Sequence, residues 1–128
     1  MSKRNLLLLL LLLTGPFTRA RSAGDELKLY FKSIGIQQGL SHQLVNAIVK
    51  DSLGFIWIGT AEGLNRYDGT EFHVYRHEPG NPNSLSTSWI NCLYITRDGR
   101  LFIGTEKGVN VYNFQKENFE RISAENDS

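Results

Sequence analysis

The sequence predicts an all-β fold built from two four-stranded antiparallel blades of an incomplete β-propeller. Three observations carry this prediction: an internal repeat with a period of 45 residues, short apolar runs bounded by glycine, and a strand that is apolar on both faces. Four-stranded units of about 40–45 residues that stack face to face around an axis describe a propeller.

The repeat is clearest when residues 40–67 are aligned on residues 85–112 without a gap. Ten of the 28 aligned pairs are identical, where ordinary residue frequencies would give about two. The identical pairs are Leu40/Leu85, Ser41/Ser86, Asn46/Asn91, Gly54/Gly99, Ile58/Ile103, Gly59/Gly104, Thr60/Thr105, Gly63/Gly108, Asn65/Asn110 and Tyr67/Tyr112. Trp57 is exchanged for Phe102, so an aromatic residue keeps its place in the structural repeat motif.

Residues 1–20 have the pattern of a secretory signal peptide. Two basic residues precede eight consecutive leucines, Leu6–Leu13, and small residues follow up to Ala20. Eight leucines fall far short of the ~20 apolar residues that span a membrane. We expect cleavage after Ala20, with Ser22 as the second choice, and export of the remaining chain.

The charge balance argues against a nucleic-acid partner. The chain has 14 basic and 13 acidic residues, and removal of Lys3, Arg4 and Arg19 with the leader leaves 11 against 13, a net charge of about −2. No basic stripe remains to neutralise phosphates. The single cysteine, Cys92, excludes an internal disulfide. Because it aligns with Ala47 inside an apolar strand, we expect it to be a small buried side chain.

The elements follow in chain order. Residues 24–39 are expected to be a lead-in, with a strand at Leu27–Lys32 and a loop at Ser33–Gly39, because the apolar residues alternate there. Blade 1 takes residues 40–84 and blade 2 takes residues 85–128. The strands expected in blade 1 are Val45–Lys50, Phe55–Gly59, Gly63–Tyr67 and Glu71–Tyr75, and those in blade 2 are Ile90–Ile95, Arg100–Gly104, Val109–Asn113 and Asn118–Ile122. Glycine-containing turns separate them, since glycine readily adopts the positive φ of tight hairpins.

The second strand of blade 1 requires neighbours on both sides. Phe55 and Trp57 lie on one face and Ile56 and Ile58 on the other, so this sheet must be sandwiched between others. Trp57 is therefore expected to pack between blades rather than to stack on a sugar. Repeat architectures generally need at least three units, and we expect two blades alone to be oligomeric, aggregated or partly unfolded.

The first repeat resembles the two-component regulator propeller repeat. The resemblance rests on Val45–Ile48, on Asp51–Thr60 with its Gly-Phe-Ile-Trp-Ile-Gly-Thr core, and on Gly63–Gly69 with Phe72. It extends over residues 30–128 and is weaker in the second repeat. There, Phe102 replaces the tryptophan, Val111 stands for Arg66, Asn113 for Asp68 and Thr96 for Asp51, and the turn Phe114–Glu117 is two residues longer and lacks glycine.

The resemblance implies a function for the longer protein from which such repeats come. In the family, the propeller is the periplasmic sensor region of a hybrid two-component histidine kinase of Bacteroidetes-type bacteria, and it recognises polysaccharide breakdown products. By this resemblance the chain is an N-terminal fragment that lacks the kinase. It would use further blades in cis, an oligosaccharide ligand and no cofactor, and it would meet the membrane only through missing C-terminal parts. A fragment of a secreted propeller enzyme acting on polysaccharide, or a non-functional gene remnant, remains the alternative.

The sequence offers no catalytic motif and no metal-ligand cluster. His73 and His77 are four residues apart, but the prolines and glycine that follow exclude a continuing helix there. Asp51, Glu62 and Asp68 fall in turns, where carboxylates commonly accept hydrogen bonds from backbone amides. Trp89, near a strand start, is the one weak candidate for stacking on a sugar ring.

Glycines at the ends of two apolar strands are expected to matter for folding rather than for ligand contact. Gly59 and Gly104 occupy the same place in the two repeats. The expected reason is that a bulky side chain would strain the following turn.

Overall fold

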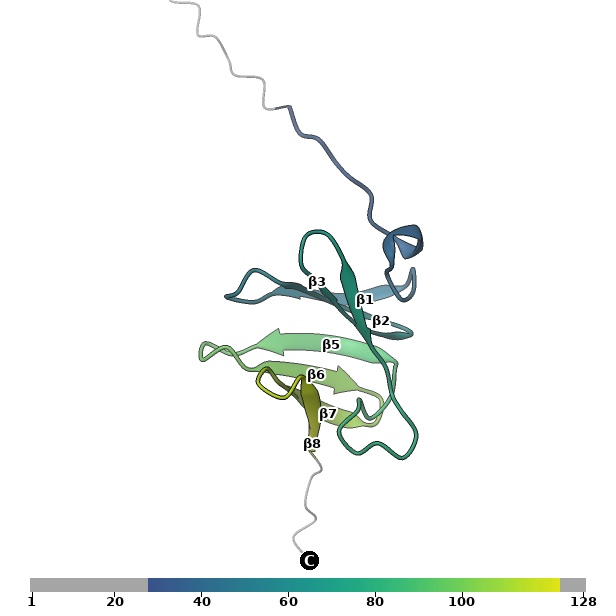
Figure 1. Ribbon diagram of the computed structural model, residues 1–128, viewed down its shortest axis with the longest axis vertical. Helices are drawn as coiled ribbons and strands as arrows, with labels where there is room; N and C mark the ends of the chain where they lie inside the picture. Colours follow the sequence, from purple (N-terminus) through teal and green to yellow (C-terminus); the bar gives the residue numbers. More distant parts are fainter. Residues whose placement is uncertain (1–27, 123–128) are drawn as a thin grey trace, which may run out of the picture. The chain divides into compact units, whose positions relative to one another are not determined.

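A computed structural model describes residues 28–122, and the expected signal peptide lies outside this range. The chain from Lys32 onward forms two four-stranded antiparallel sheets, in the strand orders β1-β2-β3-β4 and β5-β6-β7-β8 (Figure 1). The elements are η1 (Ile36–Gln38), β1 (Val45–Lys50), β2 (Ile56–Thr60), β3 (Gly63–Tyr67), β4 (Phe72–Tyr75), β5 (Ile90–Ile95), β6 (Leu101–Thr105), β7 (Gly108–Asn113) and β8 (Asn118–Ile122). The all-β prediction with two four-stranded blades is confirmed. The strand bounds agree with expectation to within one residue.

The expected strand at Leu27–Lys32 is wrong for the part that the structure describes. Residues 28–35 form no strand, and a short 3-10 helix, η1, follows them. The alternation of apolar residues is real, but a strand needs a hydrogen-bonding partner, and both four-stranded sheets are complete without this segment. The only helix among the described residues is thus far too short to cross a membrane.

The two sheets pack face to face, with β5 lying against β1 and β2 (Figure 1). Phe55 and Trp57 face blade 2, whereas Ile56 and Ile58 face away and line a hollow on the other side of the sheet. The two-sided apolar strand is therefore covered on one side by blade 2. The core between the sheets consists of Trp57, Leu64, Leu85, Ile90, Leu101, Ile103, Tyr112 and Phe119, each at most 3% exposed.

Each blade also has a face that no described residue of the other blade covers. The outer face of blade 1 comprises Val45, Ile48, Ile56, Ile58, Tyr67 and Phe72. The open face of blade 2 comprises Cys92, Tyr94, Phe102, Val109 and Ile122, which are connected by cross-strand pairs in the sheet register.

Cys92 lies on this open face and is exposed, so the expectation of a buried side chain is wrong. The alignment with Ala47 identified the right position in the blade. Ala47 is partly covered because blade 2 packs on its side of blade 1, and no described blade does the same for Cys92.

A polar latch explains why several identical residues recur in the two repeats. In blade 2 the Oδ1 atom of Asn110 accepts a hydrogen bond from the backbone amide of Ser86 at 2.9 Å, and the Ser86 hydroxyl lies 2.8 Å from that of Thr105. In blade 1 Asn65, Ser41 and Thr60 make the same contacts. Both asparagines are fully buried. The latch ties the segment that enters each blade to its second and third strands.

Gly59 is required for a different reason from the one expected. Its φ does not fall in the left-handed range, so turn strain is not the cause. A Cβ atom at this position would lie 2.5 Å from the Cγ2 atom of Ile90 and 3.6 Å from the Cγ atom of Leu93, both on blade 2. Gly59 thus permits the close approach of the two blades. A Cβ at Gly104 would collide instead with the Sγ atom of Cys92.

The linker between the blades is fastened to the last strand. The Phe119 amide donates a hydrogen bond to the Asn83 carbonyl at 2.9 Å. Arg121 donates to the carbonyl oxygens of Ser84 at 3.1 Å, Asn81 at 3.0 Å and Leu85 at 3.1 Å. The segment that leads into blade 2 therefore runs along the edge of β8.

Candidate functional site

Trp57 is the centre of an aromatic and polar cluster between the blades. Its indole is fully buried and lies 4.8 Å from the Tyr112 ring, centroid to centroid. The indole nitrogen donates a hydrogen bond to the Oδ2 atom of Asp51 at 2.8 Å. The Oδ1 atom of Asp51 accepts hydrogen bonds from the backbone amides of Leu53 and Phe55 at 3.0 and 2.9 Å. The Asp51 carboxylate therefore shapes the β1–β2 turn and also orients the tryptophan.

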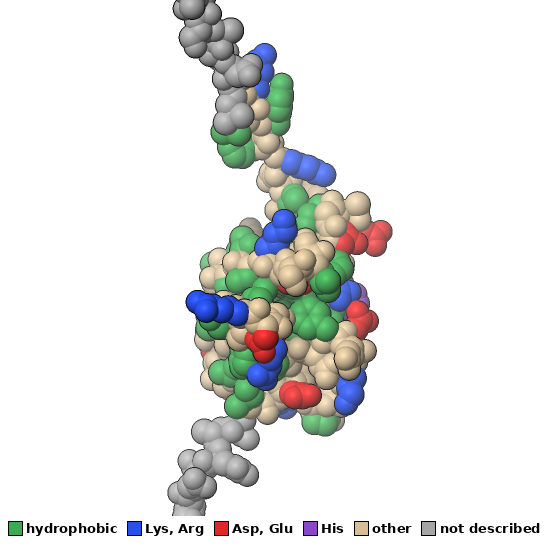
Figure 2. All heavy atoms as spheres, turned by 90° about the vertical axis from the view of Figure 1, so that its left-hand side faces the viewer, with side chains coloured by type: hydrophobic (Ala, Val, Ile, Leu, Met, Phe, Trp, Pro, Cys, Tyr) green, Lys and Arg blue, Asp and Glu red, His purple; other side chains and the backbone are tan. Residues whose placement is uncertain are grey.

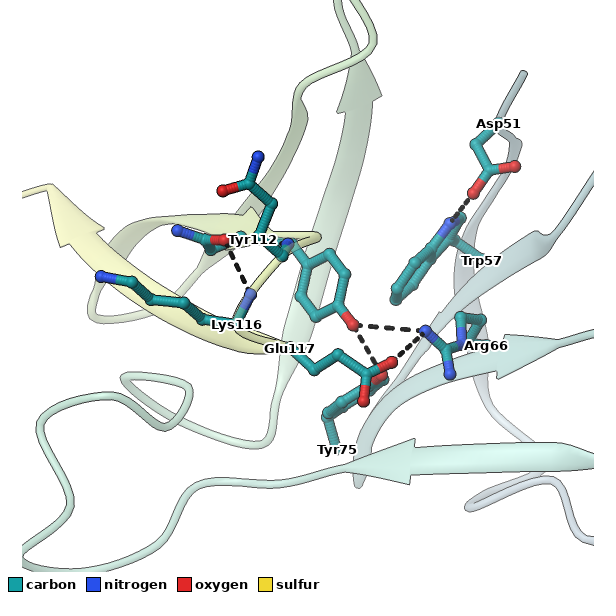
Figure 3. A network of polar contacts seen from close by, with 9 residues as sticks. Asp51, Trp57, Arg66, Tyr75, Tyr112, Lys116 and Glu117 are labelled. Atoms are coloured by element: carbon teal, nitrogen blue, oxygen red, sulfur yellow. Dashed lines mark hydrogen bonds and ion pairs between the residues drawn. The ribbon is translucent and has the colours of Figure 1, made fainter. Parts of the chain in front are cut away.

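Arg66 links the two blades beside this tryptophan (Figure 3). Its Nη1 atom donates hydrogen bonds to the Tyr112 hydroxyl at 3.3 Å and to the Oε1 atom of Glu117 at 3.1 Å. The hydroxyl groups of Tyr75 and Tyr112 lie 2.9 Å apart. The guanidinium also lies over the ring of Phe55, 5.0 Å from its centroid. Blade 1 thus supplies the cation and blade 2 the carboxylate.

The surroundings favour a charged Arg66 and neutral tyrosines. Burial works against the guanidinium charge, but the hydrogen bond to Glu117 and the neighbouring tyrosines outweigh it and raise the pKa of Arg66. Burial, with the hydrogen bond to Tyr112, raises the pKa of the Tyr75 hydroxyl well above its ordinary value. Burial likewise raises the pKa of Tyr112. Both phenols therefore remain protonated at neutral pH and can donate hydrogen bonds.

Sequence reasoning does not find the Arg66–Glu117 contact. The replacement of Arg66 by Val111 in the second repeat and the longer turn Phe114–Glu117 read, in the sequence, only as departures from the repeat. In the structure, that turn places Glu117 in the left-handed region with φ 50° and brings its carboxylate to Arg66. The signal that could have revealed the pair is an arginine present only in blade 1 together with a longer acidic turn present only in blade 2.

Two clefts occupy equivalent places at one end of the blades. The cleft in blade 1 has a volume of about 200 Å³ and is lined by Phe55, Arg66, Asp68, Glu71, Phe72 and His73. The cleft in blade 2 has a volume of about 290 Å³, and its lining includes Arg100, Asn113 and Glu120. The β5–β6 turn lies on the left of Figure 1, and Figure 2 looks onto that side, where cationic and anionic side chains are interspersed with apolar ones. Mixed charges beside aromatic rings suit a neutral ligand with many hydroxyl groups better than a polyanion.

Two turn carboxylates at this end are held by their own backbone. The Oδ1 atom of Asp68 accepts hydrogen bonds from the amides of Thr70 and Glu71, each at 2.7 Å. The amide of Glu71 and then Thr70 lower the pKa of Asp68 to about 2. A hydrogen bond from Thr96, with a smaller contribution from Arg100, lowers the pKa of Asp98. The expectation that turn carboxylates bind backbone amides thus holds for Asp51 and Asp68.

The structure does not bring Trp89 together with these clefts. Trp89 precedes β5, whose first residue pairs with Thr105 at the end of β6, so it lies at the opposite end of the sheet from the β5–β6 turn. Its side chain is 39% exposed. His73 is exposed on β4 and the Nδ1 atom of His77 lies 2.7 Å from the Leu85 carbonyl, while no described histidine, cysteine, aspartate or glutamate belongs to a group that could hold a metal ion.

Comparisons with known proteins agree with the geometry of the repeats. The profile of the two component regulator propeller family matches residues 39–62 and 84–107. Each matched segment begins at the residue before the latch leucine and ends just after the β2–β3 or β6–β7 turn.

Two relatives carry the same kind of repeat. A protein named histidine kinase P4 from Formosa agariphila is 43% identical over 44 residues, which are 34% of this chain and 3% of that protein. The crystal structure of the extracellular domain of a protein described as a hybrid two component system from B. thetaiotaomicron superimposes with a TM-score of 0.67 at 33% sequence identity, covering 75% of this chain and 14% of the other. This chain therefore spans only a small part of both. Its two blades are repeats of the two-component regulator propeller family.

Proposed function

We propose that this chain is the N-terminal part of the periplasmic, ligand-sensing propeller of a two-component signalling protein. The observation that carries the proposal is the match of both repeats to the two-component regulator propeller, together with the likeness to the extracellular domain of a hybrid two-component system. The leader-like residues 1–20 support export of the chain. Ligand binding would be the task of this part, and phosphoryl transfer the task of a kinase elsewhere in the longer protein.

The ligand class that we propose is an oligosaccharide derived from a polysaccharide. The blade 1 cleft supports this choice because it combines the aromatic rings of Phe55 and Phe72 with Arg66, His73 and two acidic side chains. Such a lining offers hydrogen-bond donors and acceptors to sugar hydroxyl groups beside apolar surfaces. Trp89 offers a second place, where a half-exposed indole can stack on a sugar ring.

The test is binding of a panel of defined neutral and acidic oligosaccharides to the exported chain, measured by isothermal titration calorimetry and by thermal shift. A ligand present at 100 times its Kd should stabilise the fold by about 2.7 kcal/mol. His73→Ala should weaken binding in the blade 1 cleft, and Trp89→Ala should weaken binding at the opposite end. Leu44→Ala is the matched control for Trp89, since Leu44 holds the equivalent position in blade 1 and is 46% exposed.

The outcomes separate the alternatives. Binding that neither variant weakens would refute both proposed places. A complete panel without a heat or stability signal would refute the oligosaccharide proposal. Depolymerisation of the panel, followed by chromatography of the products, would indicate the propeller enzyme that the sequence leaves as an alternative.

A further inference from the structure

We propose that the open face of blade 2 binds the outer face of blade 1 of a second copy, so that copies join head to tail and close into a ring of blades. This proposal goes beyond the sensor function and does not depend on the ligand. The two blades already display one complete interface of this kind, between the inner face of blade 1 and blade 2. The repeat places equivalent residues on the two faces that remain uncovered.

The hydrogen bond that crosses between the blades has an unused counterpart on the open face. Asn46 lies in a β-bulge of β1, and its Nδ2 atom donates to the carbonyl of Ile90 on β5 at 2.8 Å. Asn91 lies in the same bulge of β5 and is exposed, and no described residue accepts a hydrogen bond from its side chain. The carbonyl of Val45 holds the place of the Ile90 carbonyl in the repeat. It is therefore the acceptor that a second copy would offer to Asn91.

The steric fit is repeated as well. Ile90 and Leu93 of blade 2 lie over Gly59, where a side chain would collide. Gly104 leaves the same gap on the open face of blade 2, and the residues equivalent to Ile90 and Leu93 on the outer face of blade 1 are Val45 and Ile48. Valine and isoleucine match the shape and polarity of the residues that they would replace.

The exposed apolar side chains are concentrated on these two faces. On blade 2, Tyr94 is 64% exposed and Ile122 is 49% exposed, and on blade 1 Ile48 is 62% exposed. Contiguous apolar surface of this kind marks an interface in a soluble protein. A head-to-tail contact between copies covers both faces in a single step.

The contact between copies differs from the one within the chain at one position. Val111 stands where blade 1 has Arg66, so a copy docked on blade 2 meets no counterpart of the pair between Arg66 and Glu117. We therefore expect reversible, concentration-dependent association that is weaker than the packing within a chain. A head-to-tail interface closes into a ring when its rotation allows closure. Propellers have about four to eight blades, which corresponds to about two to four copies.

The experiment uses two variants, each of which blocks one face. Ile48→Glu blocks the outer face of blade 1, and Tyr94→Glu blocks the open face of blade 2. Light scattering after size exclusion and native mass spectrometry should show the unaltered chain as a discrete oligomer and each variant alone as a monomer. An equimolar mixture of the two variants should form a one-to-one dimer, because one intact face of each kind remains. Leu53→Glu is the control, since Leu53 is 72% exposed in the β1–β2 turn and belongs to neither face.

A second pair of variants tests the hydrogen bond. Asn91→Ala should raise the dissociation constant between copies about fivefold and leave the melting of a dilute sample unchanged. Asn46→Ala should lower the melting temperature, because its hydrogen bond lies within the chain. Circular dichroism confirms that each variant retains β structure.

Several results would overturn the proposal. An unaltered chain that stays monomeric at 100-fold varied concentration leaves no contact between copies. Self-association of the Ile48→Glu variant would indicate a symmetric contact through blade 2 instead. A mixture that fails to pair would show that the two faces do not bind one another. None of these results bears on oligosaccharide binding, which is measured separately.

Discussion

Replacing Gly59 by alanine should press the two blades apart. The added Cβ would lie 2.5 Å from the Cγ2 atom of Ile90 and 3.0 Å from its Cβ atom, so one sheet must move by roughly an ångström. Overpacking of this kind costs about 1–3 kcal/mol. The lower chain entropy of alanine in the unfolded state offsets about 0.4–1 kcal/mol of this. We expect Gly59→Ala to destabilise the fold by about 1–2 kcal/mol, and Gly59→Val by more.

A double-mutant cycle attributes this loss to a single contact. Ile90→Leu keeps the volume of the side chain but removes its branch at Cβ, and such exchanges usually cost less than about 1.5 kcal/mol. In combination with Gly59→Ala it should recover about 1 kcal/mol, the size expected for residues in contact. Urea unfolding at one fixed protein concentration, followed by tryptophan fluorescence, measures all four members of the cycle.

Phe119→Leu serves as the matched control for the cycle. Phe119 is 3% exposed but lies on the outermost strand β8, so its effect should add to that of Gly59→Ala. Additive energies for the Gly59 and Ile90 pair would show that the close approach of the blades does not explain the glycine. Coupling of equal size between Gly59 and Phe119 would also refute this explanation, because the energy would then not belong to the contact with Ile90.

Three further predictions address the latch, the phenols and the turn. Asn110→Ala should cost about 1–3 kcal/mol in urea unfolding because it leaves the buried Ser86 groups without their partner, whereas Asn113→Ala, in an exposed turn, should cost less. Since the folded pKa of Tyr75 is raised, stability should be constant below pH about 10 and fall above it as the unfolded state loses the proton first; Tyr75→Phe should flatten this alkaline decline, and an unchanged slope would contradict the raised pKa. The pKa of Asp68 is lowered to about 2 from 3.8, so its contribution should be present above pH about 4 and disappear as the pH falls toward 2, and acid titrations of Asp68→Asn that match the unaltered chain would exclude this contribution.

Most of the blade architecture could be predicted because it is encoded locally. Glycines at the hairpin turns, such as Gly54 with φ 96° and Gly99 with φ 85°, mark strand ends directly. The period of 45 residues then shows that two units share one design. The lead-in strand failed because alternation alone does not supply a partner strand.

The contacts between blades were harder to predict because they join residues far apart in the chain. Arg66 and Glu117 are 51 residues apart, and their meeting depends on the left-handed conformation of Glu117 in a turn without glycine. Similarly, the alignment gave Cys92 the position of Ala47 but not its environment, since exposure depends on whether a neighbour covers that face. The pattern around Gly59 pointed to a turn, whereas the need for glycine comes from an isoleucine in the other blade.

The fastening of the linker along β8 has a consequence for how this chain can associate. An unpaired edge strand offers its backbone groups to other chains and invites endless strand addition. Here the amide of Phe119 already binds the carbonyl of Asn83, and the guanidinium of Arg121 holds the same linker in place. Part of that edge is therefore closed to a foreign strand. Side chains on the broad faces stay available, which favours finite assemblies over fibrous growth.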